Sequence, residues 1–199
     1  MRVAFVNKEG TSLFHDDFTN SLELSRQLSE LKNEFKLNLI RNNPNKSPFL
    51  RALFEKDLLK IYKRKLFNNF EDSHPPNGIC IPGHRKLFVD SEGEFYLCES
   101  TDGFQSIGNI NAGFDYKKII DLINNYCDLC NIDCLNCWLL RLCDLCFVSA
   151  ISGKELNLEK KRKKCDYRKK KFEDTIKFSL EIIEENPKAL NYLENTVII

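Results

Sequence analysis

Hydrophobic positions recur at two spacings in the first part of the chain. Residues 2–6 (RVAFV) and 36–40 (KLNLI) alternate between polar and apolar side chains, which is typical of short strands. Between them, the apolar residues of 21–35 are spaced three and four apart, which predicts a helix with one buried face. Strand, helix and strand in this order predict a βαβ unit over residues 1–42, with the two strands paired in parallel.

Two parallel strands alone cannot form a complete sheet, because both sheet edges would lack partners. The pattern therefore predicts that the unit is a fragment of a larger α/β barrel. Three more helices are expected: one that begins at Ser47-Pro48, one over 115–126, and one over most of the chain from Cys165 to Asn186-Pro187. Strands 86–89 and 94–97 are expected to form a hairpin that turns at Gly93.

The predicted fold class is α+β, with an N-terminal βαβα fragment of a partial barrel. Its domain organisation follows from a stretch rich in proline and glycine near the middle of the chain. We expect the barrel fragment at 1–70, a linker at 71–79, a cysteine-rich domain with a hairpin and irregular loops at 80–166, and a helical extension at 167–199.

Charge and hydropathy argue against a nucleic-acid binder and against a membrane protein. The formal net charge is +1, which does not favour a nucleic-acid binder. The N-terminus has no long apolar segment, and no stretch approaches eighteen apolar residues, so we expect a cytoplasmic protein that does not bind membranes. Nine cysteines are many for 199 residues. In a reducing compartment, clustered thiols indicate metal ligation before disulfides.

The thiols are arranged in short pairs, as metal sites require. Cys134-x2-Cys137 and Cys143-x2-Cys146 are two such pairs, and more distant cysteines can complete a site. Four thiolates can hold an iron–sulfur cluster or a tetrahedral Zn²⁺ ion. A zinc-binding interaction module is therefore the alternative to an iron–sulfur protein. The spacing Cys130-x3-Cys134-x2-Cys137 is also that of a catalytic radical S-adenosylmethionine (radical SAM) motif, but too little chain follows it to build the barrel that such a motif precedes.

The full set of cysteines resembles the SPASM domain of radical SAM peptide maturases. The pattern is C-x12-G-x4-C over Cys80, Gly93 and Cys98, then the two pairs Cys134-x2-Cys137-x5-Cys143-x2-Cys146, and finally Cys165. The last pair has two intervening residues where the family has three. The segments PGHRKLFVDSEGEFYLCE, IGNI and CWLLRLCDLCF are similar to the maturases that install thioether crosslinks in cysteine-rich peptides.

The resemblance implies two auxiliary [4Fe-4S] clusters and no catalytic residue in this chain. It implies that Cys80, Cys98 and Cys146 hold the first cluster, and that Cys134, Cys137, Cys143 and Cys165 hold the second. The fourth ligand of the first cluster stays open. Candidates are Cys127, Cys130 and His74, and the site could instead be left for a substrate thiol.

The resemblance also implies the partners. These are a cysteine-rich precursor peptide and a separate or missing radical SAM core, through which alone S-adenosylmethionine would act. The isolated chain is predicted to bind clusters and to be catalytically inactive.

Overall fold

The computed structural model describes residues 22–64, 80–84, 86–101 and 103–196. The chain forms two compact units, one of residues 1–64 and 172–199 and the other of residues 65–171. Each unit is described by itself below. None of the described helices is long and apolar enough to cross a membrane.

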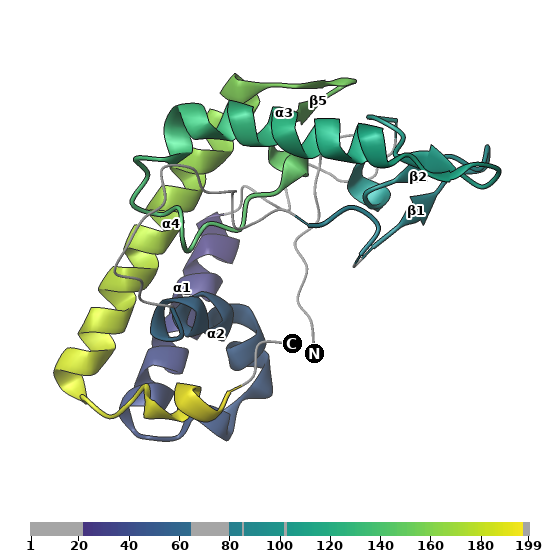
Figure 1. The fold of residues 1–199 in the computed structure, drawn as a ribbon. Helices are drawn as coiled ribbons and strands as arrows, with labels where there is room; N and C mark the ends of the chain where they lie inside the picture. Colours follow the sequence, from purple (N-terminus) through teal and green to yellow (C-terminus); the bar gives the residue numbers. More distant parts are fainter. Residues whose placement is uncertain (1–21, 65–79, 85, 102, 197–199) are drawn as a thin grey trace. The chain divides into compact units, whose positions relative to one another are not determined.

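The first unit is helical. It contains α1 (Leu22–Ile40), the 3-10 turn η2 (Pro44–Lys46), α2 (Pro48–Tyr62), the second half of α4 (Leu158–Glu185) and the 3-10 helix η5 (Asn191–Asn195) (Figure 1). Their apolar faces meet in one core. Its buried members are Phe35, Leu39, Leu50, Leu58, Leu59, Phe178, Ile182, Ala189, Leu190 and Leu193.

The expected strand at 36–40 is wrong, because these residues form the last turns of α1. The helical spacing of the preceding residues continues without a break: Phe35 and Leu39 are four apart and both are buried, whereas Leu37 is on the surface. The expected strand at 2–6 lies outside the described residues. Within the described ranges there is no parallel sheet, so the barrel-fragment prediction is not supported and its strand pairing through 36–40 is wrong.

The start of α2 and the end of α4 are as expected. The Ser47 side chain caps α2 by accepting a hydrogen bond from the backbone N–H of Leu50 at 3.3 Å. The helix α4 ends at Glu185, immediately before Asn186-Pro187. The Asn186 side chain then donates to the carbonyl of Ile40 at 2.7 Å, which satisfies one of the unpaired carbonyls at the end of α1.

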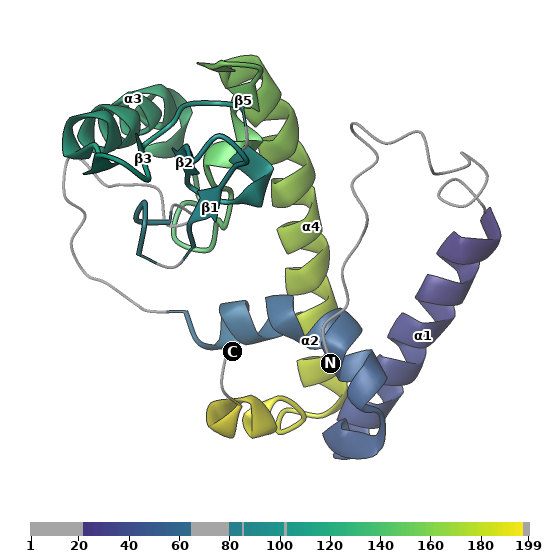
Figure 2. The ribbon, with the colours of Figure 1, turned by 90° about the vertical axis from the view of Figure 1, so that its right-hand side faces the viewer.

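The second unit combines helix α3 (Tyr116–Cys134) and the first half of α4 with three small antiparallel hairpins. The β1–β2 and β3–β4 hairpins lie near the beginning of α3 in both ribbon views (Figures 1 and 2). The hairpins are β1 (Phe88–Val89) with β2 (Phe95–Tyr96), β3 (Gly108–Asn109) with β4 (Gly113–Phe114), and β5 (Ile151–Ser152) with β6 (Glu155–Leu156).

The first hairpin confirms the expected one. Phe88 pairs with Tyr96, and Gly93 turns the chain with a φ of +83°. The second hairpin was not expected. It depends on Gly108, whose φ is +146° and where a Cβ atom would lie 2.1 Å from the carbonyl oxygen of Gly113. Only glycine allows the two strands to approach this closely.

Helix α3 is longer than the sequence pattern predicts. Asp115 caps it by accepting from the backbone N–H of Lys118 at 3.1 Å, and it continues past residue 126 to Cys134. The first part of the cysteine-rich segment is therefore helical, not irregular as expected. The second core forms around α3, with Leu97, Phe104, Ile107, Leu122, Tyr126, Cys130, Phe147 and Ala150 as its buried members.

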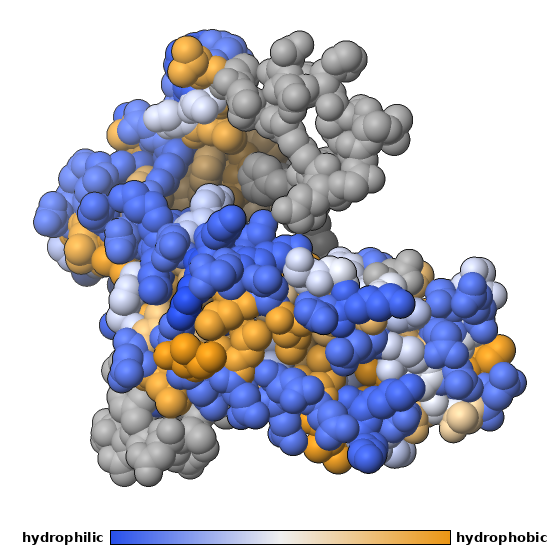
Figure 3. All heavy atoms as spheres, turned by 90° about the horizontal axis from the view of Figure 1, so that it is seen from above, coloured by the Kyte–Doolittle hydropathy of each residue, from blue (hydrophilic) through white to orange (hydrophobic). Residues whose placement is uncertain are grey.

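Not every apolar side chain is covered. In the view from above, hydrophobic residues reach the surface between hydrophilic ones (Figure 3). On α3, Ile120 and Ile132 are 57% and 63% exposed. Both side chains are thus left uncovered by the described residues.

Candidate metal centre

The last two turns of α3 bring three cysteines onto one side of the helix. Cys127, Cys130 and Cys134 follow one another at intervals of three and four residues, so they share a face. Cys130 is completely buried in the second core, while Cys127 and Cys134 are partly exposed.

A chain of tight turns continues from the end of α3. The backbone N–H of Cys137 donates to the carbonyl of Cys134 at 3.0 Å, and Leu140 donates to the carbonyl of Cys137 at 3.0 Å. These turns fold the segment after α3 back on itself. Cys137 and, further along, Cys143 thereby return to the end of the helix.

One pocket is lined by all four cysteines that the resemblance assigns to the second cluster. They come from three segments of the chain: the end of α3 (Cys134), the following loop (Cys137 and Cys143) and α4 (Cys165). The pocket has a volume of about 30 Å³ and is also lined by Tyr126 and Lys161. Cysteines from positions far apart in sequence thus line one small pocket.

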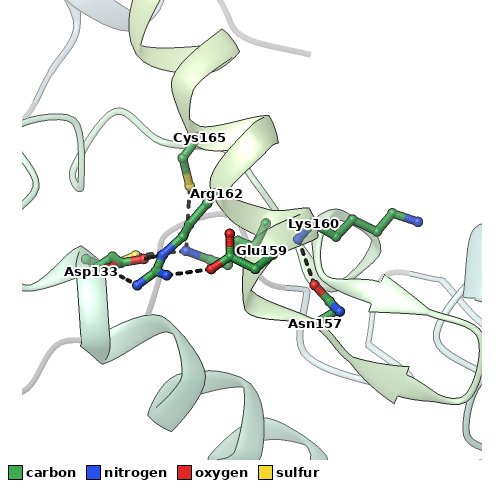
Figure 4. A network of polar contacts seen from close by, with 8 residues as sticks. Asp133, Asn157, Glu159, Lys160, Arg162 and Cys165 are labelled. Atoms are coloured by element: carbon green, nitrogen blue, oxygen red, sulfur yellow. Dashed lines mark hydrogen bonds and ion pairs between the residues drawn. The ribbon is translucent and has the colours of Figure 1, made fainter.

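Two ion pairs hold α4 against the other walls of this pocket. Arg162 binds both carboxylate oxygens of Asp133, with N–O distances of 2.8 and 3.1 Å, and also contacts Glu159 (Figure 4). This fixes the first turns of α4 beside the last turn of α3. Three residues after Cys165, Arg168 pairs with Asp144 in the loop. A bidentate arginine–carboxylate pair restricts orientation as well as distance.

Lys161 is the one cation buried at this site among the described residues. Its side chain lies one turn before Cys165 on α4, and the residue is 2% exposed. Its Nζ lies 3.1 Å from Sγ of Cys134 and 3.8 Å from Sγ of Cys165. Burial alone would lower the pKa of Lys161, but the hydrogen bond to Cys134 and the nearby thiolates outweigh it and raise that pKa.

The contacts among Lys161, Cys134 and Cys130 shift the pKa values of the two thiols on α3 in opposite directions. The hydrogen bond from Cys130 and the Lys161 ammonium lower the pKa of Cys134 to about 6, against the opposing effect of burial. The pKa of Cys130 is raised, first by its hydrogen bond to Cys134 and then by burial. These opposite shifts make Cys134 the more acidic thiol of the pair and Cys130 the hydrogen-bond donor to it.

The other three predicted ligands are Cys80, Cys98 and Cys146. Burial raises the pKa of Cys146, and the charges of Cys80 and Cys98 raise it further. Cys146 therefore lies within electrostatic range of both thiols. Cys143 and Cys146 are only three residues apart, yet Cys143 lines the first pocket and Cys146 is influenced by Cys80 and Cys98.

Similar short turns follow Cys98 and Cys146. After Cys98, the Thr101 hydroxyl donates to the Cys98 carbonyl at 2.9 Å in the 3-10 turn η3 (Glu99–Thr101). After Cys146, the Ser149 hydroxyl donates to the Cys146 carbonyl at 2.6 Å in the 3-10 turn η4 (Phe147–Ser149). Each hydroxyl holds the backbone of its cysteine in place.

Tyr126 is buried beside the thiols. It lines the pocket of Cys134, Cys137, Cys143 and Cys165, and its pKa is raised by burial and also by the charges of Cys130 and Cys146. Its ring packs on Phe147 with 4.6 Å between the ring centroids. A buried aromatic pair thus lies next to the cysteine pocket.

The three remaining candidate ligands are Cys127, Cys130 and His74. The Cys130 thiol is hydrogen-bonded to Cys134, and burial raises the pKa of Cys127. His74 lies outside the described residues. All nine cysteines are free thiols, and among the described residues no three His, Cys, Asp or Glu side chains converge closely enough to hold one metal ion.

Sequence reasoning missed Lys161 and Tyr126. In the basic run around Cys165, Lys161 precedes Cys165 by four residues and therefore shares its face of the helix. That spacing was the available signal. Comparison of the chain with protein-family models, with curated proteins and with solved structures gives no match.

Proposed function

We propose that the chain binds two auxiliary [4Fe-4S] clusters as the SPASM portion of a radical SAM peptide maturase. Its role would be to support the crosslinking of a cysteine-rich precursor peptide. The S-adenosylmethionine chemistry would belong to a core outside the described residues. In this proposal, Cys134, Cys137, Cys143 and Cys165 hold one cluster, and Cys80, Cys98 and Cys146 hold the other.

The observation that carries the proposal is the shared pocket of Cys134, Cys137, Cys143 and Cys165. The resemblance to the SPASM domain assigns these four residues to one cluster, and they come from three separate segments. Thiolates are the usual ligands of iron–sulfur clusters. The donor set therefore fits such a cluster, and the buried Lys161 beside it suits an anionic centre because a buried ammonium needs negative partners.

The chain's own residues would act by orienting the ligands and excluding water. The Arg162–Asp133 pair positions Cys134 relative to Cys165. Tyr126 lines the pocket and would exclude water from it. When bound, the clusters would supply electron transfer and, at a site with an open iron, binding of a substrate thiol.

Cys80, Cys98 and Cys146 supply three thiols to the first cluster, which has no assigned fourth ligand. The candidates are Cys127, Cys130, His74 and a thiol of the precursor peptide. The hydrogen bond of Cys130 to Cys134 favours the other candidates over Cys130.

The test is anaerobic reconstitution of the full chain with iron and sulfide. We expect about eight irons and as many sulfides per chain, with visible absorbance typical of iron–sulfur clusters. Cys165→Ala should lose about half of the iron. Tyr167→Ala is the matched control, because Tyr167 is exposed on the same helix, and it should keep the full amount.

Two outcomes would contradict the proposal. The first is a colourless protein that binds zinc and takes up no iron or sulfide under these conditions, which is the behaviour of a zinc-binding module. The second is equal iron content in Cys165→Ala and the unmodified chain. The second result would show that the pocket on α4 is not a cluster site.

A further inference from the structure

Lys161 is chemically unusual for its position. Lysine is almost never fully buried unless it is paired, yet this residue is 2% exposed. Its Nζ contacts Sγ of Cys134 at 3.1 Å and Sγ of Cys165 at 3.8 Å. The ammonium thus bridges two ligands that come from different helices.

Among the described residues, the hydrogen-bond partners of the Lys161 ammonium are sulfur atoms and not carboxylates. The nearest carboxylate along α3, Asp133, is occupied by both nitrogen contacts of Arg162 (Figure 4). The contacts of the Lys161 ammonium are to thiol sulfurs of the pocket. A neutral thiol is a poor partner for a buried cation, whereas a metal-bound thiolate carries permanent negative charge.

We propose that Lys161 is a positioning residue for the second cluster, whose ammonium donates hydrogen bonds to the ligand sulfurs of Cys134 and Cys165 and raises the reduction potential of that cluster. This inference rests on the function proposed above. Hydrogen bonds to the sulfurs and the net charge of the site are among the factors that set cluster potentials.

The direction of the effect follows from charge. In the reduction, one electron from an external reductant such as dithionite is added to the cluster, and no bond forms or breaks. The added negative charge is stabilised by a cation at hydrogen-bond distance in a site from which water is excluded. Removal of the ammonium should therefore make reduction harder, while the first cluster, which Lys161 does not contact, should be unaffected.

The experiment compares variants of the reconstituted full chain by redox titration, with the reduced clusters observed by electron paramagnetic resonance. In Lys161→Met, which keeps a flexible apolar stem, one of the two potentials should become more negative. We expect at least a tenfold shift in the reduction equilibrium, about 59 mV for a one-electron couple. Lys161→Arg, which keeps the charge, should restore most of the potential.

The matched control is Lys164→Met. It removes the same charge from an exposed position on the same helix, next to Cys165, and both of its potentials should equal those of the unmodified chain. If Lys161→Met loses one cluster and Lys161→Arg retains it, the role of the charge is likewise supported.

Three results would overturn the inference. Equal potentials in Lys161→Met and Lys164→Met would remove the role of Lys161 and leave the proposed function standing. Loss of the cluster in both the Met and the Arg variant would show that Lys161 acts through packing and not through charge. Failure of the unmodified chain to bind iron would overturn the inference together with the proposed function.

Discussion

The two units of this chain are built on different sources of stability. The first unit closes a core of ten buried apolar residues between helices. The second unit has three hairpins whose strands are only two residues long, and its core includes a cysteine. A two-stranded hairpin is at best marginally stable by itself. The difference is that apolar burial between helices can fold the first unit, whereas we expect the second unit to gain stability only if its thiols bind a metal or cluster.

Removal of metal should separate the two units most clearly. We expect a chelator to loosen residues 80–171 and to leave the helical first unit folded, because small structural metal sites contribute on the order of 10 kcal/mol to folding. Limited proteolysis with mass spectrometry would locate the cleavage sites. Equal protection of both units with and without metal would remove the contrast.

Truncation of a core side chain should destabilise the first unit and leave the second unit unchanged. Leu39→Ala deletes a fully buried side chain of the first unit, and it should lower the free energy of unfolding by about 2–5 kcal/mol. Chemical denaturation followed by circular dichroism measures this loss, and iron content should not change. Leu37→Ala is the control, since Leu37 is 37% exposed on the same helix, and its effect should be below about 1 kcal/mol.

The turn after Cys98 offers a smaller effect in the second unit. Thr101→Val removes a buried hydroxyl that donates to the Cys98 carbonyl and accepts from the Cys98 N–H. The expected cost is about 1–2 kcal/mol, because two backbone groups lose their partner. Iron occupancy of the first cluster should fall in the reconstituted chain. Thr101→Ser keeps the hydroxyl and should retain the iron, and a similar loss in both variants would contradict the assigned role.

The smallest expected effect concerns the cap of α2. Ser47→Ala removes the side-chain acceptor for the Leu50 N–H and should cost about 1 kcal/mol. Ser47→Asn should preserve stability, as asparagine caps equally well. Thermal unfolding of the first unit measures the difference. A change in iron content instead of stability would show that the two units are not energetically distinct.

Local signals explain which parts of the fold could be predicted. The turn at Gly93 and the cap at Ser47 act over a few residues, and both predictions are confirmed. The segment 36–40 fits both a two-residue and a helical period, and packing of Leu39 in the core decides for the helix. The hairpin at Gly108 depends on a close backbone approach that no sequence period encodes.

The candidate site also has a part that could be predicted from the sequence and a part that could not. The resemblance to the SPASM domain implies the grouping of Cys134, Cys137, Cys143 and Cys165, and the structure places these four around one pocket. The cation of that pocket was missed because the lysines and arginines around Cys165 look alike in sequence. Only packing against α3 buries Lys161 while its neighbours stay at the surface.

The division of α4 between the units has a consequence for synthesis of the chain. The first unit takes its core from residues 22–64 and again from 172–196, so residues 65–171 are made in between. At 5–20 residues per second, the N-terminal helices wait roughly 5–20 s for Phe178 and Ile182 to arrive. During that interval the apolar faces of α1 and α2 lack part of their cover, so we expect the nascent chain to expose apolar surface until its synthesis is nearly complete.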